Sequence, residues 1–399
     1  MLTRGSPSYS KTKLSEEIET MGARLRGGAD REQQSLGLNV FKGDVSKACH
    51  ILGEAFSSAT LDPAEVELAK QELLHEHEAN HHEYERTTIE NCHYNSFREH
   101  QMGQPIRGDA DRVQLLTPDV LHAYRAANYY GNNIVVVGTG AVSHEQLVDE
   151  VSRSFSSIVQ TASTPKANMD KAIHIPSLLM IRDDEMYNSN VGVFYDAPSI
   201  KHPDYFAFRL LKHIAGDYRI DKNAEHLNDA AKQYNSMHML LGNLVDVTRS
   251  ASHYHAYSDS GIWGNYFFGN EVFTRQMNYV GVAVPTIWSH YMNDVEVYRG
   301  RNHLYNELMN KDNHSDINNE IGSQMLSIGR RMHRSEIAAR VASMDAYHMK
   351  HLVNEWFYDA EPSFTNWGPI DNTASIGSYK YFKINTMATV TNMHHSLAT

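Results

Sequence analysis

The sequence has little cysteine, a shortage of basic charge and no long apolar run, and each shortage excludes a class of protein. Two cysteines in 399 residues cannot form a disulfide framework, so nothing here requires an oxidising compartment. With 36 basic and 48 acidic side chains the net charge is −12, which excludes a generic nucleic-acid binder. The longest apolar run, around 134–137, is far shorter than the roughly 20 residues of a membrane helix, so we expect a soluble or peripheral protein without a transmembrane helix.

What is present indicates a folded protein with an unusual amount of histidine. A hydrophobic content of 41% and an aromatic content of 10% provide enough core for two domains. The 24 histidines raise the question of a metal site. The first fifteen residues contain Arg4, Lys11 and Lys13 but no acid, a weak resemblance to an organelle transit peptide, and they lack the apolar stretch of a secretory signal.

The first half predicts helices with recognisable starts and one strand. Asp62 is a natural N-cap, Pro63 occupies the first helical position and Glu65 completes a capping box, so a long helix begins there. The other elements predicted in this half are a helix opened by Thr117-Pro118, a buried strand at 133–137 and a helix capped by Ser143 with Gln146.

The second half alternates strands and helices in a similar way. We predict strands at 178–182 and 191–195, and one or two strands within 254–268. The predicted helices span 205–215, 272–291, 294–309, 317–328, 335–344 and 346–357.

The two halves also share residues at a nearly constant offset. Glu65, Val66, Lys70 and Leu73 line up with Glu296, Val297, Arg301 and Leu304. Further on, Arg112, Val113, Leu116, Leu121 and Tyr129 line up with Arg340, Val341, Met344, Met349 and Phe357. Two pairs of amphipathic helices can match by chance, because their apolar residues share a period. That shared period does not explain why an arginine-valine pair stands at the same point of both copies. The repeat predicts an α+β fold of two homologous α/β lobes, at 1–158 and 177–399, with 159–176 as linker.

Residues 75–83, HEHEANHHE, carry the densest polar cluster. His77, Glu78 and His81 satisfy H-E-x-x-H, which on a helix places two imidazoles one turn apart for zinc, with the glutamate as base. In a histidine-rich chain the pattern also arises by chance, and no third ligand follows at a defined distance. A solvated helix face of mixed charge is the simpler interpretation.

Other catalytic signatures are missing. The sequence contains no G-x-S-x-G, no phosphate-binding G-x-x-x-x-G-K-[ST], no C-x-x-C, and no G-x-G-x-x-G after a predicted strand. Cys49 and Cys92 each precede a histidine, but adjacent helical residues point in different directions, so these pairs are not catalytic dyads by themselves.

Several segments in order resemble one family. They are EEIETMGARL (16–25), ADREQ (29–33), the helix from Asp62, MGQPIRGDADRVQLLTPDVLHAY (102–124), YSDSGIWGNY (257–266), IGSQMLSIGRR (321–331) and NWGPI (366–370). They are similar to the pitrilysin-like metallopeptidases, in particular the beta subunit of the mitochondrial processing peptidase and the core 1 subunit of ubiquinol-cytochrome c reductase (respiratory complex III). The resemblance implies two homologous α/β lobes.

The family's peptidases carry H-x-x-E-H, with two zinc histidines and a glutamate base, and a third zinc ligand on a later helix. Aligned without gaps, the third ligand falls on Glu76, and the last histidine of the motif would fall one position before Met1. The resemblance thus implies a first lobe truncated at its N-terminus, with H-x-x-E-H absent from the sequence. We expect no catalytic, cofactor-binding or metal residues, Glu76 being the relict third-ligand position, and zinc only if an upstream motif exists.

Other positions also differ from those of the active members, and these differences likewise favour a chain without peptidase activity. Active members resemble one another in having acids on the helix face of Glu76, where this chain has Ala69 and Ala79. Where the family has an asparagine that pairs with the substrate backbone, this chain has Arg26, followed by Gly27-Gly28. The glycine-rich loop of the alpha-type subunits is also absent, which favours the beta or core 1 branch.

The resemblance implies a non-catalytic core 1 type structural subunit of complex III, a component of respiratory electron transport on the matrix face of the mitochondrial inner membrane. Its partners would be a core 2 or alpha-type subunit and other complex III subunits, without nucleic acid. The alternatives are the beta subunit of the zinc-dependent processing peptidase, with its zinc motif missing from the sequence, a double role as an active core subunit, and the zincin interpretation of His77 and His81.

The truncated lobe has a structural consequence. Family lobes begin with strands ahead of the metal helix, so without them we expect an unpaired sheet edge in the first lobe. We predict that another chain, or an N-terminal segment outside this sequence, pairs there.

Overall fold

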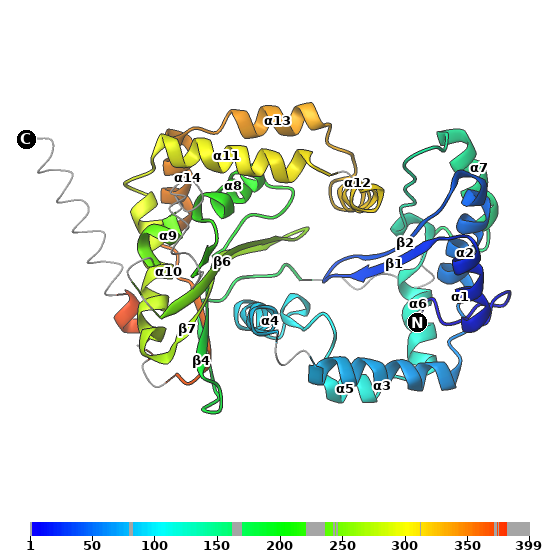
Figure 1. The fold of residues 1–399 in the computed structure, drawn as a ribbon, viewed down its shortest axis with the longest axis horizontal. Coiled ribbons are helices and arrows are strands. Elements are labelled where there is room, and N and C mark those ends of the chain that lie inside the picture. Colours follow the sequence, from blue (N-terminus) through cyan, green and yellow to red (C-terminus); the bar gives the residue numbers. More distant parts are fainter. Residues whose placement is uncertain are drawn as a thin grey trace, which may run out of the picture. The chain divides into compact units, whose positions relative to one another are not determined.

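A computed structural model of the chain describes residues 2–79, 83–161, 170–220, 236–241, 244, 246–311, 313–370, 373 and 375–380 (Figure 1). Its mixed helices and sheets confirm the predicted α+β fold class. Among the residues that the structure describes, no helix combines the length and apolar character needed to span a bilayer.

The chain forms two compact units, and neither is one continuous segment. Unit 1 comprises Met1–His81, Ile106–Asp170 and Lys311–Arg331, and unit 2 comprises His82–Pro105, Lys171–Asn310 and Met332–Thr399. Helix α4 (Tyr84–Phe97) of the first half therefore belongs to unit 2, and helix α12 (His314–Ile328) of the second half belongs to unit 1. The lobe boundaries predicted at 158 and 177 stay a prediction, and residues 162–169 of the predicted linker lie outside the described residues.

Unit 2 is built on a six-stranded sheet in the order β3-β8-β4-β7-β6-β5. Its strands are β3 (Leu178–Arg182), β4 (Asn188–Asp196), β5 (Tyr218–Arg219), β6 (Val247–Ala256), β7 (Gly261–Asn270) and β8 (Ser363–Gly368). Strand β3 runs parallel to β8, and every other neighbouring pair is antiparallel. The predicted strands at 178–182 and 191–195 are confirmed, and the segment 254–268 contains parts of two strands.

Helices cover both faces of this sheet (Figure 1). Those packed on the sheet are α4, α8 (Tyr205–Ala215), α9 (Ser236–Leu241), α10 (Thr274–Trp288) and α14 (Ala346–Phe357). Helices α11 (Asp294–Met309) and α13 (Arg334–Ala342) pack on α8. Consecutive strand residues point to opposite faces. Because Gly192 of β4 meets Cys92 of α4 while Val193 meets Gly281 of α10, α4 and α10 lie on opposite faces.

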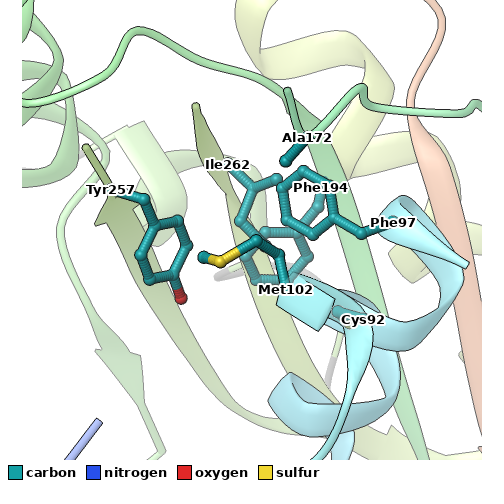
Figure 2. Packing of buried hydrophobic residues seen from close by; sticks show 7 residues of the cluster. All are labelled: Cys92, Phe97, Met102, Ala172, Phe194, Tyr257 and Ile262. Atoms are coloured by element: carbon teal, nitrogen blue, oxygen red, sulfur yellow. The ribbon is translucent and has the colours of Figure 1, made fainter. Parts of the chain in front are cut away.

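A buried cluster fixes α4 to the sheet. Figure 2 shows Cys92 and Phe97 of α4 with Met102, Phe194, Tyr257, Ile262 and Ala172, all of them buried. The cluster joins residues from four separate parts of the chain. Removing this apolar surface from water, at about 25 cal/mol per Å², favours the docked position of α4.

Unit 1 has a smaller sheet. Strands β1 (Arg24–Ala29) and β2 (Gln34–Asn39) form an antiparallel pair, and its helices are α1 (Lys11–Thr20), α2 (Val45–Ser58), α3 (Pro63–Ala79), α5 (Ala110–Gln114), α6 (Pro118–Asn128), α7 (His144–Ser154) and α12. The predicted capping box of α7 is confirmed, since Ser143 and Gln146 exchange hydrogen bonds. The predicted cap of α3 is confirmed as well, because Oδ1 of Asp62 accepts a hydrogen bond from the backbone of Ala64 at 2.8 Å.

The internal repeat extends to the order of elements. The series α1, β1, β2, α2, α3, α4, α5 and α6 has the same succession as α8, β6, β7, α10, α11, α12, α13 and α14, except that β5 and α9 stand between α8 and β6. At the offset that pairs Tyr129 with Phe357, Gly140 corresponds to Gly368, and both have positive φ, +107° and +120°. Residues 135–140 are therefore the counterpart of β8.

One predicted strand is wrong. The residues predicted as a buried strand, 133–137, form no strand: Asn133 ends a short 3-10 helix (Gly131–Asn133), and the side chains of 134–137 are only half-buried. Their counterpart β8 lies between β3 and β4 and pairs with both, whereas in unit 1 the described residues pair β1 with β2 alone. An apolar, β-branched sequence favours extended backbone, but a strand also requires a neighbour to receive its hydrogen bonds.

Candidate functional site: the acidic face of helix α3

Helix α3 carries Glu76, the residue that the sequence places at a relict zinc-ligand position. It spans Pro63–Ala79, and of its residues only Val66 is buried. The side chain of Glu76 is 58% exposed, and its carboxylate lies 3.7 Å from Nε of Arg107. An arginine therefore occupies the immediate surroundings of this carboxylate.

Two other acids of α3 also face cations of the N-terminal residues. Nη1 of Arg4 donates to Glu65 at 3.0 Å, and Lys11 lies 3.7 Å from the same carboxylate. Arg4 bonds in addition to Glu72, one turn before Glu76. The face of α3 is thus a chain of ion pairs that links this helix to the N-terminal residues and to the segment around Arg107.

These residues do not fit a catalytic zinc. Such a site needs three protein ligands and an open position for water. In the described ranges, no three His, Cys, Asp or Glu side chains lie close enough together to hold a metal ion. Ala69 and Ala79 contribute no ligand atom to the helix, and the guanidinium of Arg107 places positive charge beside Glu76. The arrangement holds segments of unit 1 together.

The structure describes only two of the three named residues of the H-E-x-x-H pattern. His77 and Glu78 lie in the last turn of α3, where Nε2 of His77 is buried without a hydrogen-bond partner among the described residues. His81 lies outside the described residues. The proposed pair of imidazoles stays a prediction.

Strand β1 contains Arg26 and the two glycines that follow it. All three are exposed, and β1 pairs only with β2, in a register that sets Arg26 opposite Gly37. Its second edge has no strand neighbour among the described residues. Backbone donors and acceptors at such an edge can pair with an extended peptide.

Neither cysteine is a reactive nucleophile. Burial raises the pKa of Cys92 to about 12, and burial together with Glu150 raises the pKa of Cys49. Both thiols therefore stay protonated near neutral pH. The ring of His93 is engaged elsewhere, with the carbonyl of Ile89 and the hydroxyl of Tyr257, each at 2.7 Å.

The sequence did not predict a row of polar contacts between α4 and β6. Nε2 of His253 lies 3.0 Å from Glu85, which also pairs with Arg249, and these contacts hold the pKa of Glu85 below its usual value. His255 continues the row, with its ring 4.9 Å from that of His93. The signal was present in β6, since Arg249, His253 and His255 are spaced by even numbers and face α4. Nothing in the sequence named α4 as their partner.

Comparisons with known proteins give consistent results. Residues 1–110 match the model of the family described as Insulinase (Peptidase family M16), and residues 115–280 match the model described as Peptidase M16 inactive domain. A probable mitochondrial-processing peptidase subunit beta of Arabidopsis thaliana is 24% identical, over 95% of this chain and 71% of that protein. The subunit beta of Blastocladiella emersonii is 27% identical, over 92% and 78%, and that of Bos taurus 26%, over 93% and 75%.

Among solved structures, a chain of "Complex III2 from Candida albicans, Inz-5 bound" has a similar fold. The TM-score is 0.80 and the sequence identity 18%, with 91% of this chain and 86% of that chain covered. At this identity the likeness demonstrates a shared fold.

Proposed function

The chain belongs to peptidase family M16, and on that premise we propose that it is a non-catalytic core 1 type subunit of mitochondrial respiratory complex III. The observation that carries the proposal is the ion-paired face of α3, where Glu76 is paired with Arg107 instead of joining a set of metal ligands. The sequence also contains no H-x-x-E-H. For a family member without a set of metal ligands, the remaining role is to bind other subunits through the surfaces of its lobes.

The proposed location is the matrix face of the inner membrane, with a core 2 or alpha-type chain as principal partner. Support comes from the mitochondrial relatives and from the fold shared with a chain of a complex III structure. An obligate interface between two such chains would bury 2,000 Å² or more. The acidic, helix-covered chain is expected to be peripheral to the membrane.

Purification of the natural assembly tests this role. The chain should be tagged, isolated from mitochondria in mild detergent, and assayed for haem absorption and for ubiquinol-cytochrome c reductase activity. We expect both to co-purify with the chain in constant ratio through gel filtration. An assembly that contains a second M16 chain but neither haem nor reductase activity would contradict the proposal.

The second candidate is the beta subunit of a zinc-dependent processing peptidase. It is favoured by the curated relatives quoted above, which carry that name, and by the exposed edge of β1, which can receive an extended peptide. This candidate requires metal-binding residues beyond those in the sequence. The intact mass of the natural protein distinguishes the two, because it reveals any residues ahead of Met1.

A further inference from the structure

The outward face of α11 carries a row of exposed aromatic and aliphatic side chains. Tyr291, just ahead of the helix, and Val295, Tyr298 and Tyr305 within it are 40%, 66%, 60% and 46% exposed. Large apolar side chains that share one helix face differ from isolated exposed residues, which need no explanation. We refer to these four residues as the α11 stripe.

The stripe has the spacing of a coiled-coil seam. Its members, continued through Asn302 and Met309, are separated by alternating steps of four and three residues, the a/d pattern of a heptad repeat. The buried residues of α11, Val297, Leu304 and Leu308 among them, lie on a different face of the helix. Because that buried face attaches α11 to unit 2, the stripe is not needed to hold the helix in place.

The internal repeat supplies a comparison within the same chain. Helix α3 is the counterpart of α11, and at the positions of Val295 and Tyr298 it has Ala64 and Glu67. The repeat alone therefore does not require apolar residues there. The stripe is a property of α11 and not of the fold.

Charges on both sides of the stripe indicate what it can receive. Arg299 and Arg301 occupy the flanking e and g positions beside Tyr298 and Asn302, and Asp294, at the g position ahead of Val295, is the one acid among the flanking residues. Arg301 is held in place, since Nη1 donates to the carbonyl of Ala342 at 3.0 Å and the guanidinium lies 5.7 Å from the centre of the Tyr298 ring. Tyrosine and arginine are the residues enriched at the energetic centres of protein interfaces.

A second copy of the chain is a poor match in the antiparallel arrangement. In an antiparallel pair e positions face e positions and g positions face g positions, so the register that overlaps the whole stripe brings Arg299 near Arg299 of the other copy and Arg301 near Arg301. Like charges at flanking positions disfavour pairing. Acidic side chains at the same positions would instead form ion pairs with both arginines. Charge complementarity therefore favours a partner helix with acidic flanks.

We propose that the α11 stripe is a docking surface for an amphipathic α-helix of another protein, with apolar residues at its a and d positions and Asp or Glu beside them. The surface lies entirely within unit 2. The inference goes beyond the role in complex III, and it holds for either candidate function.

Two designed peptides test the chemistry of the partner. Each has three heptads with leucine at a and d; one carries glutamate at e and g, the other lysine. Fluorescence anisotropy with the full chain should give binding of the glutamate peptide and at least about tenfold weaker binding of the lysine peptide. Tyr298→Ala should weaken the first by about tenfold, and Arg299→Glu with Arg301→Glu should reverse the preference.

Leu68→Ala provides the matched control, because Leu68 is exposed on the counterpart helix α3 and should not affect binding. Equal affinity for both peptides, or indifference to Tyr298→Ala, would overturn the proposal. Sedimentation of the chain alone tests whether a second copy occupies the stripe. A dimer that Tyr298→Ala abolishes would identify a second copy as the occupant and would overturn the proposal.

A labelling experiment tests occupancy in the natural assembly. Cys49 and Cys92 are buried, so a Val295→Cys variant presents one exposed thiol among the described residues. Maleimide should label it several times more slowly in the assembly than in the isolated chain. Equal rates would contradict docking at this surface, whatever the outcome of the reductase assay.

Discussion

At the scale of single residues, His174 is a half-buried base whose protonation should oppose folding. Burial lowers its pKa from 6.5 to about 4, and Nε2 has no hydrogen-bond partner among the described residues. Between those values the unfolded chain binds more protons than the folded one, so the free energy of unfolding falls as the pH is lowered from 6.5 towards 4. Above pH 6.5 the ring is neutral in both the folded and the unfolded chain, so its protonation no longer reduces the free energy of unfolding.

The corresponding prediction concerns the slope of stability against pH. His174→Gln should remove on the order of 3 kcal/mol of the decrease between pH 6.5 and 4, measured by urea denaturation at several pH values. His348→Gln is the control, because His348 is exposed on α14. Parallel curves for the wild type and the His174 variant would show that this residue does not titrate as proposed.

The contact between Gly192 and Cys92 gives a second prediction at this scale. A Cβ at position 192 would collide with Sγ of Cys92 and meet the Phe194 ring at 3.5 Å. Gly192→Ala should therefore cost about 1 to 3 kcal/mol of stability through overpacking.

The double variant identifies the cause. Cys92→Ala removes the sulfur, so Gly192→Ala should cost less in that background than in the wild type, as a thermodynamic cycle from chemical denaturation would measure. Additive effects would show that Gly192 is required for its backbone and not for the approach of α4.

At the scale of elements, the ends of helices are the features that sequence predicts best. Helices α8, α11 and α14 begin and end where the pattern predicts, because local signals mark them. For example, Asn293 accepts a hydrogen bond from Val295 at the start of α11, and Asp345 from His348 at the start of α14. These contacts lie within a few residues of each other.

Pairing and packing partners were harder to predict. The segment 133–137 has the composition of a strand but depends on neighbours far away in the chain. The assignment of α4 to unit 2 and of α12 to unit 1 has no local signal either. The cations beside Glu76 and Glu65 were missed for the same reason, since Arg4 and Glu65 are 61 positions apart.

The incomplete sheet of unit 1 leads to a prediction about backbone protection. In unit 2, β4 lies between β7 and β8, and the counterparts of those two strands in unit 1 are β2 and 135–140. We predict that an extended segment pairs there in the natural assembly. Amide hydrogen exchange should show protection of residues 134–138 in the assembly and rapid exchange in the isolated chain.

The amides of α7 serve as the internal reference for that measurement, since their hydrogen bonds form within the helix and should be similar in both samples. Rapid exchange at 134–138 in the complete assembly would mean that the edge stays open.

At the scale of the whole molecule, the chain combines the fold of a peptidase family with an ion-paired helix face. Glu65, Glu72 and Glu76 of α3 are engaged with Arg4, Lys11 and Arg107, so this face links segments of unit 1. Each exposed ion pair contributes at most about 1 kcal/mol to stability. The main effect of the network is therefore to fix the positions of the segments that it links. The abundant histidines form no metal group within the described part of the chain.

The central claim is that the assembled chain is not a peptidase, and one measurement tests it most directly. The purified natural assembly should be analysed for zinc and incubated with a presequence peptide, alongside an assembly that carries Glu76→Gln. We predict no zinc stoichiometric with this chain, and any residual cleavage should be the same in both assemblies. One zinc per chain, with cleavage that Glu76→Gln abolishes, would contradict the account.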